Sequence, residues 1–409
     1  MSSFRVLGIE TSCDDTAVGI VRSDGKILGE CARSQWEPVH AHWGGIVPHL
    51  AARSHESCIE EVTRRAVVAA NGAGDFDFDA VAVTVGPGLA PCLRVGASFA
   101  EKLAEQHSVP LIQVNHLEAH LLTPRMFIKD NCEFPFLVLL VSGGHTMLVL
   151  ARGVGDYILI GDTMDQSVGE TFDKVARSLG VVTEGTDHAH PGAALEARAA
   201  RGNPRRFDLP RPLSKSKNHA GCAFSFSGLL SAVNRKIDAL ENISDSDIDD
   251  MAASFQCASA MHLSQRLRRA IVWCDAAGGR ARGDNEKEKK EKQKHLEGAE
   301  QDLLGSLCVP KSIVVSGGAA RNGEIRRMIS AVGAEAGIPV SYPPMEYCTD
   351  NGIMIAWAGV EQANAMCGRD AVSAPVESLR HLKSREAGDA ASKVKPRWPP
   401  FDLTPHPLP

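Results

Sequence analysis

The sequence lacks the features that mark several common protein classes. Its 11 cysteines are scattered without a Cys-x-x-Cys pair, so neither a zinc ribbon nor a disulfide framework is indicated, and we expect a reducing compartment. No apolar run is long enough to cross a bilayer, and the first residues lack the core of a signal peptide, so we expect a soluble protein with no membrane partner. The net charge of -6 is no signature of nucleic-acid binding, so an RNA contact would need a local basic patch or a partner protein.

The 409 residues, 44% of them hydrophobic, are enough for two domains with substantial cores. Residues 275–301 contain an almost purely charged run that cannot bury apolar surface. We interpret this run as a solvated insertion; its interleaved glutamates make a role in holding RNA the weaker alternative. Residues 385–409 are rich in proline, alanine and charge, which predicts a loosely attached tail.

A pair of histidines follows the apolar run Val109–Val114, which is typical of a short buried strand. If the chain turns helical there, His116 and His120 project from one face, because four residues at roughly 100° each return the second ring above the first. This is the spacing of a two-histidine metal half-site at a strand end, where ligands often bind in α/β sheets. The pair alone leaves open that both are surface or satisfied core histidines.

The same segment differs from the zincin protease signature His-Glu-x-x-His, in which the base directly follows the first histidine. Glu118 stands one position later, roughly 200° around the helix from His116, and so faces away from the metal side. Peptide hydrolysis is therefore disfavoured.

Strands and helices alternate along the chain, which predicts an α/β protein. Phe4–Glu10 and Thr16–Val21 form a hairpin with an acidic tip, and a strand, small polar turn and strand recur at Phe136–Leu150. This recurrence indicates an internal duplication. Helices are expected at Ala51–Ala70, Ala97–His107, Gly169–Leu179 and Phe255–Ala270.

Two Gly-Gly turns follow buried strands, at Ser142–Gly144 and Ser316–Gly318. Backbone without Cβ atoms can approach a phosphate, although each pair alone is also explained by a tight turn. Together with the acidic hairpin they predict a two-lobed nucleotide clamp made of a duplicated strand-hairpin and helix unit. This architecture resembles the superfamily of actin, the heat-shock chaperone ATPases and the sugar kinases. We place the lobes at residues 1–131 and 132–370, with a tail at 371–409.

Nine motifs carry a resemblance to one family. They are Gly8–Thr16, Gly44–Pro48, Gly86–Leu89, His116–His120, Val141–Thr146, Gly169–Lys174, Phe224–Leu229, Gly317–Gly318 with Asn322, and Cys348–Gly352. In this order they resemble the tRNA N6-adenosine threonylcarbamoyltransferases, the TsaD family, once described as O-sialoglycoprotein endopeptidases. The resemblance covers nearly the whole chain outside the charged insertion and the tail. The Ile-Glu-Thr-Ser-Cys-Asp-Asp opening resembles the bacterial and mitochondrial branch.

The resemblance implies a metal site and a nucleotide site. Asp350, in the C-terminal lobe, matches the family's third metal residue beside His116 and His120, and this set would bind one divalent ion, iron or zinc. The nucleotide and its phosphate would contact Leu140, Val141, Ser142, Gly143 and Gly144. The ribose hydroxyls and the adenine side would be bound by Asp173 and Asn322, with Gly192 beside them.

The implied reaction transfers threonylcarbamoyl from threonylcarbamoyl-adenylate, supplied by a separate synthase, to N6 of the adenosine beside the anticodon of tRNAs that read codons beginning with A. The metal would polarise the threonylcarbamoyl oxygens, and the glycine loops would stabilise the departing phosphate. Asp14 would accept the amine proton as the catalytic base or would only order its loop.

We expect tRNA to bind basic residues such as Arg33, Arg53 and Arg94, or across a homodimer.

Two segments depart from the family pattern. His49 stands where the family has glutamate, which removes an acid from that position. Pro191-Gly192-Ala193-Ala194 replaces Pro-Gly-Gly-Pro after the extra residues 183–190, and Ala193 adds a Cβ where close backbone approach is expected.

Two other functions fit parts of the pattern. A sugar-kinase-like or chaperone-like ATPase would need an acidic residue for magnesium and a base near the γ-phosphate, and Asp14 and Asp15 could serve. A site of two histidines and one aspartate, however, suits magnesium poorly. A scaffold that only binds adenylate would not need the metal ligands. The branch resemblance implies a mitochondrial location if the source is eukaryotic, although residues 1–5 are too few for an Arg-rich presequence; the alternative is a cytoplasmic location.

Overall fold

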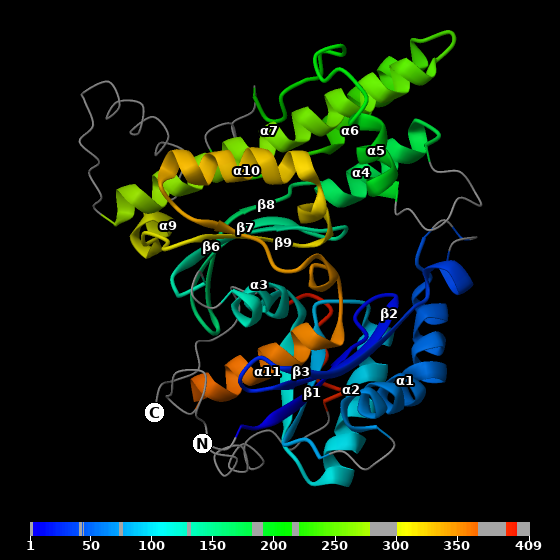
Figure 1. The fold of residues 1–409 in the computed structure, drawn as a ribbon, viewed down its shortest axis with the longest axis vertical. Coiled ribbons are helices and arrows are strands. Elements are labelled where there is room, and N and C mark those ends of the chain that lie inside the picture. The colour runs from blue at the N-terminus through cyan, green and yellow to red at the C-terminus, as the bar shows by residue number, and fades with distance from the viewer. Residues whose placement is uncertain are drawn as a thin grey trace. The chain divides into compact units, whose positions relative to one another are not determined.

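The computed structural model describes residues 3–40, 43, 45–72, 77–128, 132–181, 191–214, 221–278, 301–366 and 390–398. The chain divides into two compact units (Figure 1). The first comprises Met1–Lys129, Gly153–Tyr157 and Thr349–Pro409, and the second comprises Asp130–Arg152 and Ile158–Cys348. The first break lies close to the predicted lobe boundary, but the chain returns to the first unit at Thr349. Asp350 therefore lies in the same unit as His116 and His120, and not in the unit of the nucleotide loops.

The first unit contains a mixed five-stranded sheet in the order β3-β2-β1-β4-β5, in which β1 is antiparallel to β2 and parallel to β4. Its strands are β1 (Arg5–Glu10), β2 (Asp15–Arg22), β3 (Ile27–Ser34), β4 (Ala80–Gly86) and β5 (Leu111–Asn115). Its helices are α1 (Pro48–Asn71), α2 (Ala90–His107), α3 (His116–Phe127) and α11 (Gly352–Met366), with a short helical turn η1 (Trp36–His40).

Glycines allow α11 to lie directly on the sheet of the first unit. Gly8 of β1 and Gly19 of β2 are paired across the two strands. A Cβ on Gly8 would approach the backbone nitrogen of Ala356 in α11 to 2.2 Å, and one on Gly352 would approach the nitrogen of Gly19 to 2.2 Å. Only residues without a Cβ allow this contact, which fixes the start of α11 and with it the preceding Asp350.

The second unit repeats the same strand arrangement in the order β10-β9-β6-β7-β8. Its strands are β6 (Phe136–Val141), β7 (Thr146–Gly153), β8 (Asp156–Asp162), β9 (Ile313–Ser316) and β10 (Val340–Ser341). Its helices are α4 (Val168–Ser178), α5 (Pro191–Ala199), α6 (Ser227–Asp238), α7 (Asp245–Ala277), α9 (Gln301–Ser306) and α10 (Gly323–Ala336), with the short turns η5 (Gly318–Arg321) and η6 (Met345–Tyr347). In each unit the first strand pairs antiparallel with the next strand and parallel with a later one, as the predicted duplication requires.

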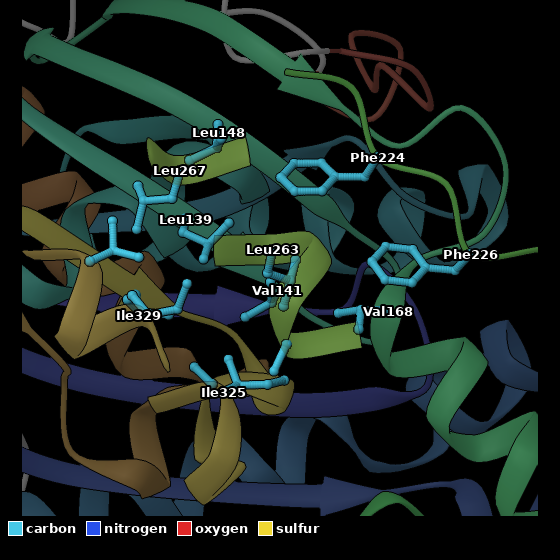
Figure 2. Packing of buried hydrophobic residues seen from close by; sticks show 14 of the residues in the cluster. Leu139, Val141, Leu148, Val168, Phe224, Phe226, Leu263, Leu267, Ile325 and Ile329 are labelled. Carbon is cyan, nitrogen blue, oxygen red and sulfur yellow. The ribbon is translucent and has the colours of Figure 1, made fainter. Parts of the chain in front are cut away.

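Buried apolar side chains fill the space between the second sheet and its helices (Figure 2). Leu139 and Val141 of β6 and Leu148 of β7 lie in the same cluster as Leu263 of α7 and Ile325 of α10. These five side chains are fully buried. The alternation of strands and helices thus gives the α/β class that the sequence predicts.

Two of the predicted helices begin well before their predicted starts. The predicted helix at Phe255 begins ten residues earlier, at Asp245, because Ser244 and Asp247 form a capping box. The predicted helix at Ala97 begins at Ala90, with Pro91 in its first turn, where proline is tolerated. No helix of the described segments is long and apolar enough to cross a bilayer.

Part of the predicted loose tail is packed. Ala390 is fully buried in the core of the first unit, and the backbone nitrogen of Lys395 donates to Val85 O at 2.7 Å. The side chain of Asn115 donates to Trp398 O at 2.7 Å. The prediction of a loose attachment was therefore wrong for residues 390–398, because their backbone hydrogen bonds join them to β4 and to the start of α3. Most of the charged insertion lies outside the described residues.

Candidate functional site

The two histidines of the predicted half-site lie in the first two turns of α3. Asn115 caps this helix, because its side-chain oxygen accepts hydrogen bonds from Leu117 N and Glu118 N. The rings of His116 and His120 are 4.7 Å apart between centroids and lie edge to face. Both side chains are almost fully buried. The helical spacing thus places the two imidazoles side by side, as predicted.

Asp350 meets both histidines from the chain segment that precedes α11. Its Oδ1 lies 3.0 Å from Nε2 of His120 and 3.5 Å from Nε2 of His116. The three side chains each offer one ligand atom, and these atoms lie within 4.8 Å of one another. The side chain of Asp350 is 31% exposed, whereas those of His116 and His120 are 6% and 3% exposed, so the group opens to solvent on the aspartate side.

Glu10 is a further residue at this site that the sequence did not single out. Its Oε2 lies 3.0 Å from Nδ1 of His116, and its carboxylate also accepts hydrogen bonds from Thr84 Oγ1 and Ser12 N. With Nδ1–H donated to Glu10, Nε2 of His116 is left to face Asp350. The signal in the sequence was an acidic residue that directly follows the apolar residues Val6–Ile9.

The electrostatics of the group favour a cation. Burial alone would lower the pKa of His116, but the carboxylates of Asp350 and Glu10 raise it to about 9. Burial raises the pKa of Asp14, and burial together with the Asp14 carboxylate raises the pKa of Asp15 to about 7. The carboxylates of Asp350 and Glu10 thus favour positive charge at the His116 imidazole. A divalent ion would occupy the position of the proton that His116 otherwise binds. Two imidazole nitrogens and one carboxylate oxygen fit iron or zinc, and this donor set does not choose between them.

Glu118 is separate from this group. Its Oε1 accepts hydrogen bonds from Gly155 N and Tyr157 Oη, each at 2.9 Å, and its Oε2 accepts one from Gln362 Nε2 at 2.9 Å. These contacts attach the turn Gly153–Tyr157 and α11 to α3. The carboxylate of a zincin protease would instead face the metal, so this geometry agrees with the exclusion of peptide hydrolysis.

Asp14 lies in the turn between β1 and β2, and His55 of α1 orders that turn. Nε2 of His55 lies 3.1 Å from Cys13 O, and Nδ1 lies 2.7 Å from Thr16 Oγ1. Burial lowers the pKa of His55, so the ring stays neutral and carries a single proton. That proton lies on Nε2, which donates to Cys13 O. Asp14 is half-buried, and its charge acts on Asp15 and Cys13. No periodicity of α1 distinguishes His55 from an ordinary core residue.

The first Gly-Gly turn of the second unit is open. Leu140 and Val141 are fully buried in β6, whereas Gly143 and Gly144 are exposed. A Cβ on Gly143 or Gly144 would meet no described atom within 4 Å. The side chain of Ser142 accepts a hydrogen bond from His145 N at 2.9 Å, which closes the turn. Packing therefore does not explain these two glycines, and their exposed backbone leaves room for a ligand.

The second Gly-Gly turn differs from the first. Gly317 has φ +97°, and a Cβ there would approach Val141 O to 2.3 Å. This glycine is required by the backbone conformation and by the packing of the turn against β6. The second turn thus has a structural explanation that Gly143 and Gly144 do not have.

Asn322, Asp173 and Gly192 lie at or in helices of the second unit. Asn322 caps α10 by accepting hydrogen bonds from Glu324 N and Ile325 N, and its Nδ2 donates to Gln256 Oε1 at 2.8 Å. Asp173 lies in α4, and Gly192 is the second residue of α5. Glu196 of α5 accepts a hydrogen bond from Gly323 N at 2.7 Å, so α5 is joined to the start of α10.

The predicted tRNA contacts are divided between two places in the first unit. Arg53 of α1 and Arg94 of α2 line one cavity of about 1090 Å³, together with Lys102 and Glu60. Arg33 is exposed on β3 and does not line this cavity.

Comparison with known proteins decides the family. A sequence model of the family TsaD, tRNA N6-adenosine threonylcarbamoyltransferase, matches residues 26–357. A protein of this name from Brucella anthropi is 42% identical over 363 residues, which cover 88% of this chain and 90% of the relative.

The chain belongs to the tRNA N6-adenosine threonylcarbamoyltransferase family. Further relatives of the same name are 42% identical in Methylocapsa acidiphila, over 88% of this chain and 91% of the relative, and 41% identical in Rhizobium meliloti, over 93% and 96%. The chain is therefore a transferase that acts in tRNA modification, as the sequence motifs predict. These relatives are bacterial and point to a cytoplasmic protein, so the expectation of a mitochondrial location was wrong.

The solved structures that the chain resembles are more distant. They include component A of (R)-2-hydroxyglutaryl-CoA dehydratase from Acidaminococcus fermentans, 13% identical over 87% of this chain and 96% of that chain, with a TM-score of 0.46. HypF from T. kodakarensis is 16% identical over 87% and 46%, with a TM-score of 0.49. A ROK-family glucokinase from Streptomyces griseus is 12% identical over 87% and 97%, with a TM-score of 0.40. The expected α/β class is confirmed by the two mixed five-stranded sheets and their helices.

Proposed function

We propose that the protein transfers a threonylcarbamoyl group from threonylcarbamoyl-adenylate to N6 of the adenosine beside the anticodon, in tRNAs that read codons beginning with A. The family match, together with the convergence of His116, His120 and Asp350, carries this proposal. The adenylate would be supplied by a separate synthase. The amine of adenosine attacks the carbamoyl carbon, the bond from that carbon to the phosphate oxygen breaks, and adenylate leaves.

The residues of the first unit would serve this reaction by binding and by proton transfer. His116, His120 and Asp350 would bind one divalent ion, iron or zinc. When bound, that ion would polarise the threonylcarbamoyl oxygens. Asp14 would accept the amine proton, and the burial that raises its pKa supports this role, because a stronger base takes that proton more readily. Glu10 would keep His116 oriented.

The residues of the second unit would bind the adenylate. The exposed turn Ser142–Gly144 would bind the phosphate through backbone N–H groups, beside Leu140 and Val141. Asp173 and Asn322 would bind the ribose and the adenine side, with Gly192 of α5 close to the cap of α10. The tRNA would be bound by Arg53 and Arg94 in their shared cavity and by Arg33, or across a homodimer.

Incubation of the purified protein with the adenylate and unmodified tRNA, followed by mass spectrometry of the nucleosides, tests the proposal. We expect threonylcarbamoyladenosine to form without ATP. Unmodified adenosine throughout, with ATP hydrolysed in a parallel tube, would instead support the kinase-like ATPase. Binding of the adenylate without either reaction would support a scaffold.

A further inference from the structure

A second cavity lies in the second unit, between the loop 204–212 and α7. Its volume is about 270 Å³. The loop is fixed to α7 by hydrogen bonds from Asn203 N to Asp250 Oδ1 at 2.7 Å and from Phe207 N to Ser254 Oγ at 3.3 Å. Pro204, Pro210 and Pro212 restrict its backbone further. The cavity is therefore bounded by a loop that is fixed at several points and not by a freely moving segment.

The wall of the cavity combines apolar surface with one buried histidine. Phe207 is half-buried, and Met261 is 38% exposed beside it. His262 is 1% exposed and accepts a hydrogen bond from Ser225 N at its Nε2. Burial lowers the pKa of His262 to about 3, so the ring is neutral and its proton lies on Nδ1. Nδ1 is fully buried, and the ring lies edge to face against Phe224 and Phe226, so His262 supports the wall of the cavity.

Three arginines give the loop a positive charge. Arg205, Arg206 and Arg211 are exposed, and none of them forms an ion pair within the described part of the chain. The guanidinium of Arg206 lies over the ring of Phe207, 5.2 Å from its centroid. Arg205 and Arg211 both line the cavity, where Asp208 is the one acidic side chain. A small aromatic cavity with unpaired arginines at its edge matches a base with its flanking phosphates.

The cavity is joined to the proposed adenylate site through α7. Cys257 lines the cavity, and its neighbour Gln256 accepts the hydrogen bond from Nδ2 of Asn322. The charges of Glu324 at the start of α10 and of Arg205 in the loop both act on Cys257. A ligand in the cavity would therefore lie close to the segment that caps α10.

We propose that this cavity binds one unpaired base of the tRNA, with Arg205 and Arg211 on the flanking phosphates, an inference that rests on the proposed function in tRNA modification. The volume lies slightly below the roughly 300–1,000 Å³ of sites for drug-sized ligands, which suits one base. The base stacks on the side chain of Phe207. Unpaired bases are the parts of RNA that proteins bind by stacking.

Binding of full-length unmodified tRNA to the double variant Arg205→Ala/Arg211→Ala, measured by fluorescence anisotropy over a range of salt concentrations, tests the phosphate contacts. We expect at least about tenfold weaker binding at physiological salt and a slope of log K against log salt that is smaller by about 1.4 to 1.8, the value for two phosphates. The matched control Arg235→Ala/Arg268→Ala removes two exposed arginines of the same unit that do not line the cavity. Equal losses in both double variants would overturn the proposal.

The variant Phe207→Leu tests the base contact, with an RNA duplex that lacks unpaired bases as the control ligand. We expect its affinity for tRNA to fall by roughly fivefold or more, the usual effect of removing a stacking ring, with duplex binding unchanged. An unchanged affinity for tRNA, or equal losses for both RNAs, would overturn the assignment of a base site. Unchanged binding of the adenylate shows that each variant is folded. Wild-type protein that binds tRNA at this loop but does not modify it would refute the proposed function and leave this inference standing.

Discussion

Oε2 of Glu10 lies 3.0 Å from Nδ1 of His116, although 106 positions separate the two residues in the sequence. Thr84 and Ser12 bind the same carboxylate, so its position is fixed from three sides. An imidazole whose Nδ1–H is donated to a buried carboxylate presents its Nε2 in one orientation. This relationship makes Glu10 a positioning residue for the proposed metal ligands.

We therefore expect Glu10→Gln to lower metal affinity by about 10- to 100-fold, the usual effect of changing a hydrogen-bond partner of a metal-binding histidine. Competition with a chelator of known affinity measures the change. Glu118→Gln is the matched control, because Glu118 is also a buried carboxylate but binds Gly155, Tyr157 and Gln362 instead. The control should lower the melting temperature and leave metal affinity unchanged. Equal metal affinities of wild type and Glu10→Gln would contradict the assigned role.

The proposed metal ligands His116, His120 and Asp350 give a second prediction, about metal content. His120→Ala should abolish stoichiometric binding of a divalent metal, because two remaining ligands rarely retain such an ion. Elemental analysis of protein purified from cells grown with iron or zinc measures the stoichiometry and identifies the metal. His107 provides a control, since it is an exposed histidine in the last turn of α2, and His107→Ala should leave the metal content unchanged. Full metal content in the His120 variant would show that the site is misassigned.

Asn322 allows stability and ligand binding to be separated. Asn322→Ala removes the cap of α10 and should lower the free energy of unfolding by about 1 kcal/mol. Asn322→Asp keeps a good cap, and Gln256 can turn its amide to donate to the new carboxylate, so stability should change little. Loss of the amide donor should weaken adenylate binding by about 1 to 3 kcal/mol. Urea unfolding and calorimetric titration with the adenylate measure the two effects. Wild-type affinity in the aspartate variant would limit this residue to its structural role.

Asp165 gives a prediction about pH. Partial burial would raise the pKa of Asp165, but hydrogen bonds from Ser225, Ser227 and the backbone of Phe226 outweigh it and lower the pKa to about 2. The folded-state pKa is below the ordinary aspartate value of 3.8, so the carboxylate stabilises the fold above about pH 4, and this contribution is lost as the pH falls toward 2. Because the side chain is exposed to solvent, we expect only about 1 kcal/mol.

The variant Asp165→Asn tests this expectation. Its free energy of unfolding should be lower than that of wild type by about 1 kcal/mol at pH 6, and the difference should shrink steadily as the pH falls below 3.8 toward 2. Taking the difference between the two proteins at each pH cancels the titration of all other carboxylates. A difference that stays constant with pH would show that the charge of Asp165 does not contribute.

The packed segment 390–398 predicts the effect of shortening the chain. A stop after residue 389 removes the hydrogen bonds from Lys395 N and to Trp398 O and uncovers the core around Ala390. We expect the free energy of unfolding to fall by about 2 kcal/mol or more, since each hydrogen bond contributes about 1 kcal/mol and burial adds to it. A stop after Trp398 is the control and should unfold as the full chain does. Equal stability of both shortened chains would show that the segment does not support the fold.

Local patterns in the sequence were sufficient for several elements and for the two histidines of the proposed metal site. The apolar strand before Asn115 and the spacing of His116 and His120 predicted a helix with both imidazoles on one face, and α3 has that form. The recurring hairpins predicted an internal duplication, and the two sheets share one strand order. These features depend on the geometry of a few neighbouring residues, which is the same wherever the segment lies in a fold.

The rest of the site depended on contacts between distant parts of the chain. Asp350 meets His120 across 230 positions, because Gly8, Gly19 and Gly352 allow α11 to pack directly on the sheet. From the motifs alone, Asp350 was assigned to the lobe of the nucleotide loops, whereas it belongs to the unit of the histidines. Composition also predicted a loose tail, where the backbone of residues 390–398 is hydrogen-bonded to the first unit. No local sequence pattern predicts the contact of Asp350 with His120 or the hydrogen bonds of residues 390–398. Both depend on packing and on the pairing of buried polar groups in the folded chain.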